Sequence, residues 1–134
     1  AVKALGEIRD ARALELMITA LKDKDEEISR AATKALVKID PARAGEPLIE
    51  ALKKTRSDSV QQVIAGKLGD TGDPRAVQPL LDLFDNDHSK KVRESAARSL
   101  VKLYRSNALG PTEKQLILDQ QEMISSEYGA VFTI

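Results

Sequence analysis

The chain has 134 residues, with 21 basic and 21 acidic side chains, one histidine, no cysteine and four aromatic residues. This composition excludes disulfides, cysteine nucleophiles and multi-histidine metal sites, and the zero net charge is untypical of a dedicated nucleic-acid binder. No uncharged apolar stretch approaches the roughly 18 residues of a membrane-spanning helix, and apolar and charged fractions of 42% and 31% indicate a folded chain.

Leucines recur along the chain at a nearly constant spacing. Leu5, Leu36, Leu68 and Leu100 are 31, 32 and 32 residues apart, and a fixed period of roughly 20 to 50 residues is the signature of repeat architectures. The residues after the first three leucines read GEIRDARA, VKIDPARA and GDTGDPRA. They are alike, and they predict a turn between two helices in each repeat.

The first segment, residues 1–9, matches the end of a helix further along. Residues 1–5 align with residues 32–36, so the chain begins inside the second helix of a repeat, without a methionine. We expect at least half a repeat to precede it. The expected location is the cytoplasm, and a signal peptide upstream of this start is compatible with the same sequence.

Each full repeat then opens with a first helix of about a dozen residues. Its apolar residues recur at i, i+4, i+5 and i+8, which is the spacing of one buried helix face. Asp40-Pro41 and Asp73-Pro74 mark helix starts, because aspartate caps a helix and proline suits its first position. The aligned apolar positions are Ala13, Met17, Ile18 and Leu21, then Ala44, Leu48, Ile49 and Leu52, and then Ala76, Leu80, Leu81 and Phe84.

The second helix of each repeat carries an apolar stripe rich in alanine, which predicts close helix-to-helix approach. A single helix pair cannot bury its apolar face alone, whereas stacked pairs bury a continuous one. The sequence therefore predicts an all-α solenoid. The stripes are Ile28, Ala31, Ala32, Ala35, Leu36 and Ile39, then Val60, Val63, Ile64 and Leu68, and then Val92, Ala96, Leu100 and Leu103.

The period stops near residue 105. Residues 106–111 are predicted to be a linker, and residues 112–134 a C-terminal capping helix followed by an apolar tail. Thr112 and Gln115 have the spacing of a capping box at the start of that helix.

These residues resemble the HEAT-repeat family, in the short form associated with phycobilisome-lyase-like proteins. The resemblance covers residues 1–105 and rests on the DPRA turn at 73–76, the PLLDLF run at 79–84, the V-x-x-x-A-A stretch at 92–97 and the LGDTGD exit at 68–73. It implies an α-α superhelix, a right-handed HEAT-like solenoid of stacked antiparallel helix pairs. The expected units are a half repeat at 1–9 and repeats at about 10–40, 41–72 and 73–105.

Short motifs that could carry chemistry favour structural roles. The glycines between residues 66 and 72 lack the preceding strand and the spacing of a phosphate loop. The acidic turn at 85–89 lacks the glycine and the bidentate glutamate of a calcium loop. His88, in that turn, is expected to be a surface residue. We therefore expect no catalytic residue, no cofactor and no metal.

The second helices supply the candidate binding residues, since in HEAT-like solenoids they line the concave surface. Placing the apolar stripe inward at about 100° per residue leaves four columns of side chains pointing outward, with small residues at the centre and basic residues on the flank. The candidate partner-binding residues are Arg30, Thr33, Lys34, Lys38, Gln62, Ala65, Glu94, Arg98 and Lys102.

The leading functional hypothesis is a non-enzymatic scaffold or adaptor. It binds another protein, one with an acidic or mixed-charge segment, on the concave face of the second helices. The alternative that the resemblance implies is a bilin lyase-like subunit handling tetrapyrrole chromophores. A HEAT-like nucleic-acid-binding protein is a further alternative, which the broken basic columns and scarce aromatics disfavour.

Overall fold

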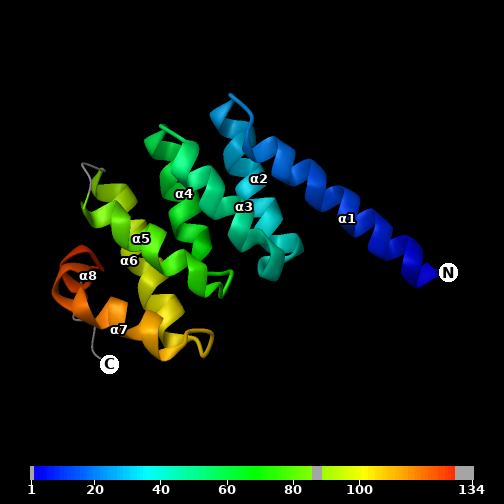
Figure 1. Cartoon of the computed structure of the whole chain (residues 1–134). Helices are drawn as coiled ribbons and strands as arrows, with labels where there is room; N and C mark the ends of the chain where they lie inside the picture. Colours follow the sequence, from blue (N-terminus) through cyan, green and yellow to red (C-terminus); the bar gives the residue numbers. More distant parts are fainter. Residues whose placement is uncertain (1, 86–88, 129–134) are drawn as a thin grey trace.

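The computed structural model describes residues 2–85 and 89–128, and within them the secondary structure is entirely helical (Figure 1). The first two helix pairs are α1 (Val2–Leu21) with α2 (Glu26–Ile39), and α3 (Pro41–Lys54) with α4 (Asp58–Leu68). The next pair starts with a 3₁₀ turn, η1 (Pro74–Ala76), which leads into α5 (Val77–Asp85) and then α6 (Lys90–Arg105). The last two helices are α7 (Pro111–Asp119) and α8 (Gln121–Tyr128).

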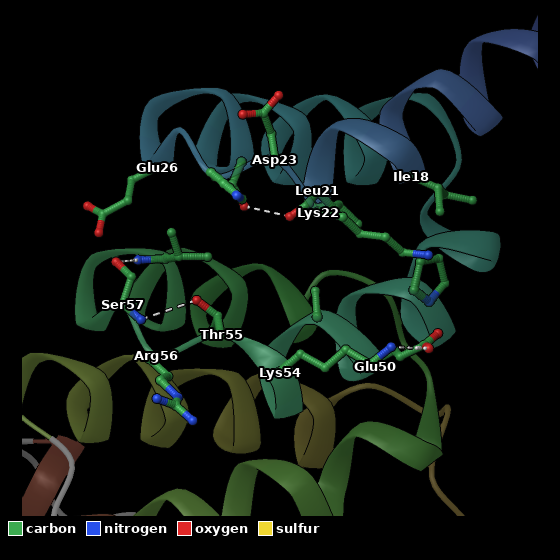
Figure 2. Close-up of a pocket in the computed structure, with 15 residues that line it drawn as sticks. Ile18, Leu21, Lys22, Asp23, Glu26, Glu50, Lys54, Thr55, Arg56 and Ser57 are labelled. Carbon is green, nitrogen blue, oxygen red and sulfur yellow. Dashed lines mark hydrogen bonds and ion pairs between the residues drawn. The ribbon is translucent and has the colours of Figure 1, made fainter.

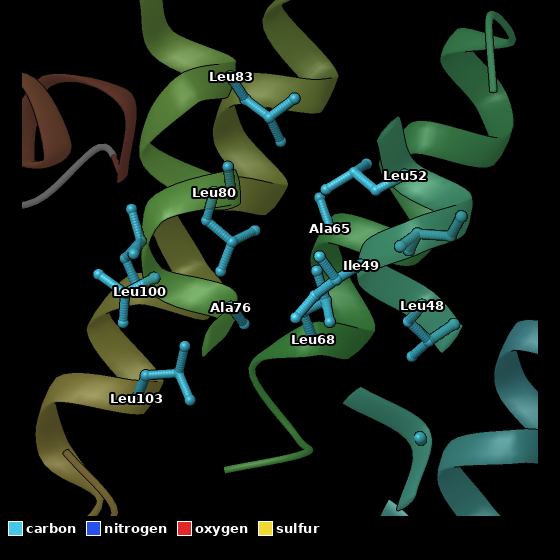
Figure 3. Packing of buried hydrophobic residues seen from close by; sticks show 14 of the residues in the cluster. Leu48, Ile49, Leu52, Ala65, Leu68, Ala76, Leu80, Leu83, Leu100 and Leu103 are labelled. Atoms are coloured by element: carbon cyan, nitrogen blue, oxygen red, sulfur yellow. The ribbon is translucent and has the colours of Figure 1, made fainter. Parts of the chain in front are cut away.

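The helix pairs stack in chain order, from α1 at one end of the molecule to α8 at the other (Figure 1). Helices α2, α4 and α6 each pack on their own first helix, and consecutive second helices from α2 to α8 pack on one another. The core is one continuous layer between the two rows of helices (Figure 3). Leu36, Leu68 and Leu100, which mark the repeat, have no exposed surface, and burying each side chain stabilises the fold by about 1.5–3 kcal/mol. The predicted all-α solenoid is confirmed.

Polar side chains cap the helix starts as their positions in the sequence predict. The carboxylate of Asp40 accepts a hydrogen bond from the backbone N–H of Arg43, ahead of Pro41 at the first helical position. Asp73 does the same for the N–H of Arg75. These caps satisfy backbone donors that the first turn of a helix leaves unpaired.

One predicted turn is absent, because α1 continues without interruption from Val2 to Leu21. Residues 4–13 (ALGEIRDARA) align with residues 67–76 (KLGDTGDPRA), which do form a turn. The two sequences differ at the two residues that enforce that turn. Gly72 has a φ of 67°, a conformation that side chains disfavour, and Pro74 blocks helix continuation. Arg9 and Ala11 replace them, and both are good helix formers. The predicted boundary between residues 9 and 10 therefore lies inside a helix.

The C-terminal region also differs from its prediction, since it forms two short helices in place of one. Helix α7 begins at Pro111 with Gly110 as its N-cap, and no side chain caps it. Proline at the first helical position moves the cap to residue 110, so the predicted Thr112–Gln115 capping box does not form. Helix α7 packs on α5 and α8 packs on α6, so these two helices extend the stack as a further pair. Residues 129–134 of the predicted apolar tail lie outside the described residues.

Candidate partner-binding face

The second helices form the inner side of a curved array. Helices α2, α4, α6 and α8 contact one another more extensively than the first helices α1, α3, α5 and α7 do. Because one row is packed more closely than the other, the array curves with the second helices on the concave side. The predicted placement of the second helices on the concave surface agrees with this packing.

Small residues allow the close approach of α4 and α6. A Cβ atom added at Gly69 would lie 2.8 Å from the Cα atom of Ser99, too close for any side chain. The N–H of Gly69 donates to the Ser99 hydroxyl at 3.1 Å, and that hydroxyl lies within hydrogen-bonding distance of the carbonyls of Ala65 and Gly66. A buried serine of α6 thus satisfies the backbone at the C-terminal end of α4, a role that sequence periodicity did not reveal.

Two predicted binding residues are buried, and their assignment to the surface was wrong. Thr33 and Ala65 have no exposed surface, and the hydroxyl of Thr33 donates to the carbonyl of Ser29 within α2. Helix α4 packs on its own first helix α3 and on the second helices α2 and α6, and α2 packs on α1, α3 and α4. The buried arc of each is therefore wider than the apolar stripe alone indicates.

The other seven predicted residues reach solvent in varying degree. Arg30, Gln62 and Glu94 are half-buried, whereas Lys34, Lys38, Arg98 and Lys102 are exposed. Lys34 and Arg98 belong to one column of the three second helices, and the residue between them, Gly66, is also exposed. This column, Lys34, Gly66 and Arg98, is referred to below as the exposed column.

Acidic neighbours lie close to the cations on α6. The Glu94 carboxylate lies 3.9 Å from the side-chain nitrogens of both Lys90 and Arg98. Lys102 forms an ion pair with Asp70, which follows α4. These pairs are largely exposed, so each contributes at most about 1 kcal/mol. Lys102 is therefore a link between repeats rather than a free binding cation.

The cations on α2 have fewer partners. The Arg30 guanidinium donates to the Ser59 hydroxyl of α4. Lys34 and Lys38 form no hydrogen bond or ion pair with any residue whose side chain the structure describes, in the ranges 12–84 and 89–125. The uncompensated positive charge of the predicted set therefore lies on α2.

A groove that the sequence did not predict lies between the first two helix pairs (Figure 2). Its volume is about 410 Å³. The carboxylate of Glu50 accepts a hydrogen bond from Lys54 at 3.0 Å, and this bond, with the nearby charges of Lys54 and Lys22, lowers the pKa of Glu50. The apolar floor includes Ile18, Leu21, Ala51 and Val60, and the charged rim is made of Lys22, Asp23, Lys24, Glu26, Glu50, Lys54 and Arg56. The rim carries side chains of both charges, and it includes loop residues whose conformation periodicity does not specify.

The described residues include no group of three or more histidine, cysteine, aspartate or glutamate side chains that could hold a metal ion. No helix in the same part of the chain has the length and apolar character to cross a bilayer. His88 and the acidic residue Asp87 beside it lie outside the described residues.

The stacked helix pairs are those of a known repeat family. HEAT repeats match the chain over residues 1–66 and again over residues 45–116. The chain belongs to the HEAT-repeat family. No curated protein and no solved structure matches it. HEAT repeats in general are scaffolds for protein interaction and are generally non-catalytic.

Proposed function

We propose that this HEAT-repeat chain is a non-enzymatic scaffold that binds an extended acidic segment of a partner protein along the exposed column. The observation that carries the proposal is the exposure of Lys34, Gly66 and Arg98 in one row across three consecutive second helices on the concave side. Lys34 has no ionic partner among the described residues, and Arg98 has only the long contact with Glu94.

The glycine at the centre of the column favours an extended ligand. Gly66 is exposed and has no side chain, so a partner backbone can approach α4 closely while its side chains reach the cations on either side. Adjacent helices lie about 8–10 Å apart, which places the two cations roughly 16–20 Å from each other. At about 3.3 Å per residue, an extended peptide spans this distance in five or six residues.

Peptide binding with defined charge spacing tests the proposal. The probes are two labelled peptides of identical composition, with paired glutamates six residues apart in one and two residues apart in the other. Fluorescence anisotropy should show at least threefold tighter binding of the six-residue spacing. Lys34→Glu/Arg98→Glu should weaken that binding about tenfold or more, since two attractive contacts become repulsive.

The matched control reverses two cations on the first helices. Arg12 and Lys53 are exposed on α1 and α3, so Arg12→Glu/Lys53→Glu makes the same change in net charge away from the exposed column. It should change binding by less than twofold. Equal weakening by both double variants, or no preference for either glutamate spacing, would contradict the proposal. No observation on the described residues favours the bilin or nucleic-acid alternatives.

A further inference from the structure

One side of α2 lacks the neighbour that covers the same side of α4 and α6. Ile28 and Ile39 are 43% and 45% exposed. At the position of Ile28, Val60 and Val92 are 4% and 0% exposed. At the position of Ile39, Thr71 and Leu103 are 9% and 0% exposed. This side, referred to below as the open α2 face, therefore carries two large apolar side chains that the repeat architecture normally covers.

In the interior of the array, residues 65–70, at the end of α4 and the start of the following turn, form a strip that covers the C-terminal half of α6. The Ser99 hydroxyl of α6 is bonded to the backbone of that strip, including Gly69, whose missing side chain permits the contact. Lys102 of α6 pairs with Asp70 at the end of the strip. The strip thus supplies a glycine for close approach and a carboxylate for a lysine.

The chain carries a second strip of the same kind. Residues 2–7 read VKALGE and align with residues 65–70, which read AGKLGD. Gly6 takes the register position of Gly69, and Glu7 takes that of Asp70. On α2, Lys38 takes the position of Lys102, and it forms no ion pair with any described residue. The open α2 face and residues 2–7 are therefore complementary in register, in residue size and in charge.

Helix α1 carries this strip away from the α2 of its own chain. It is continuous from Val2 to Leu21 and about 30 Å long at 1.5 Å per residue. Figure 1 shows its N-terminal end far from the other helices. An uninterrupted α1 cannot return residues 2–7 to the adjacent α2, because that path requires the turn that Gly72 and Pro74 enforce at the aligned junction.

We propose that a second copy of this chain covers the open α2 face, each copy placing its residues 2–7 on the α2 of the other. Reciprocal exchange of an identical element closes on a two-fold axis. It covers the C-terminal half of the open α2 face, around Ile39, and leaves Ile28 in solvent. The established α4–α6 contact is the template, and the proposed contact continues it in a second molecule. The interaction engages Ile39 and Lys38 and leaves Lys34 of the exposed column free, so it is independent of the proposed function.

Sedimentation equilibrium of the full chain tests the proposal. The wild-type chain should form a dimer that dissociates on dilution. Ile39→Lys should weaken dimerisation at least thirtyfold, because it places a charge in the apolar contact. Ile28→Lys makes the same substitution at an equally exposed isoleucine beyond the register of residues 2–7, and it should change the dissociation constant less than threefold. Circular dichroism should show unchanged helix content in both variants.

A charge exchange tests the register of the contact. Lys38→Glu should weaken the dimer about fivefold or more, because the new carboxylate would lie next to that of Glu7 and repel it. Adding Glu7→Lys to that variant should restore the affinity to within about threefold of the wild type, whereas Glu7→Lys alone should weaken it. If the double variant does not recover the dimer affinity, Glu7 does not contact Lys38 and the proposed register is contradicted.

Restoring the missing turn tests the exchange itself. Arg9→Gly/Ala11→Pro reproduces the Gly72 and Pro74 pattern, which should let residues 2–7 fold onto the α2 of their own chain. This variant should be a monomer with unchanged or higher thermal stability. A wild-type chain that is monomeric at every concentration, or a dimer weakened equally by Ile28→Lys and Ile39→Lys, would overturn the proposal.

Discussion

The junctions at residues 4–13 and 67–76 have closely similar sequences and opposite shapes. The second turns back, so that α4 and η1 lie in adjacent layers, while the first runs straight through α1. The segments differ at five of ten positions, and two of these set the shape: Gly72 and Pro74, which Arg9 and Ala11 replace. In a repeat protein, a conformational rule at two positions decides whether the next helix is covered or left open.

The same contrast appears in burial. Val92 in α6 is fully buried and Ile28 in α2 is 43% exposed, although they occupy the same position of the repeat. The neighbour in the array, rather than the residue type, sets the burial of these side chains. Seven substitutions, in four experiments, test the closed α4–α6 interior and the open α2 end.

The largest effect is expected for truncation in the interior. Val92→Ala should lower the free energy of unfolding by about 2–3 kcal/mol, because it opens a cavity in a packed layer. Ile28→Ala removes more atoms but should cost about 1 kcal/mol or less, since the side chain is already half in water. Urea denaturation of both variants measures the difference. Equal costs would show that the two helix ends are covered alike.

Replacing two glycines at the end of α4 by alanine should change the stability of the fold in opposite directions. Gly69→Ala should destabilise the fold by about 2 kcal/mol, because the added Cβ meets the backbone of α6. At Gly66 the nearest atom to an added Cβ is 3.9 Å away, so Gly66→Ala should stabilise the helix by about 0.5–1 kcal/mol. Thermal unfolding of the two variants shows whether each substitution raises or lowers the stability. A stabilising Gly69→Ala would mean that α4 and α6 lie further apart.

The hydroxyl that joins α4 and α6 should contribute less than the apolar packing. Ser99→Ala removes the side-chain acceptor of the buried N–H of Gly69 and should cost about 1–2 kcal/mol. The reverse change at the aligned position of α2, Ala35→Ser, should change stability by less than about 0.5 kcal/mol in the monomer, because no α4-like neighbour is present there. Chemical denaturation at low protein concentration checks both values.

The smallest effect concerns the cap of the closed junction and depends on pH. The hydrogen bond from Arg75 lowers the pKa of Asp73 below its usual value of 3.8. A carboxylate with a depressed folded pKa contributes stability above the unfolded pKa and loses it as the pH falls through the folded pKa. Asp73→Asn should therefore be less stable than the wild type by about 1 kcal/mol or less at pH 7. This difference should shrink below about pH 4, as unfolding curves at several pH values would show. A difference independent of pH would contradict the assignment.

Much of the fold follows from the sequence because periodicity, caps and prolines are local signals. The apolar spacing places Leu36, Leu68 and Leu100 in the core, and Asp40-Pro41 marks the start of α3; the structure confirms both. The repeat alignment predicts a turn near residue 10, and this prediction is wrong because Ala11 stands where Pro74 stands, so that α1 continues through it. The helix-forming residues Arg9 and Ala11 indicate a continuous helix, and this local preference decides the path of the chain where no residue forces a turn.

The binding face was harder to predict, because the packing between repeats is not encoded in the apolar stripe of one helix. Thr33 and Ala65 look like surface residues by helical angle, but both have no exposed surface. The carbonyl of Ala65 faces the Ser99 hydroxyl of α6. The small size of Thr33 and Ala65 was the available signal. The groove between the first two pairs involves the side chains of two loops, and no periodic pattern specifies those.

The most direct test of the account is the shape of α1, since its continuity is what leaves the α2 face open. The chain has no cysteine, so Lys3→Cys/Thr19→Cys allows two spin labels to be attached specifically. Double electron–electron resonance spectroscopy then measures the distance between the two labels of one chain, because the labelled protein is diluted with unlabelled protein. A continuous helix predicts a single distance of about 24 Å between the two backbone positions, from 1.5 Å per residue. Arg9→Gly/Ala11→Pro should shorten it. A wild-type distribution centred below about 15 Å would contradict the account, because α1 would then turn back onto its own repeat.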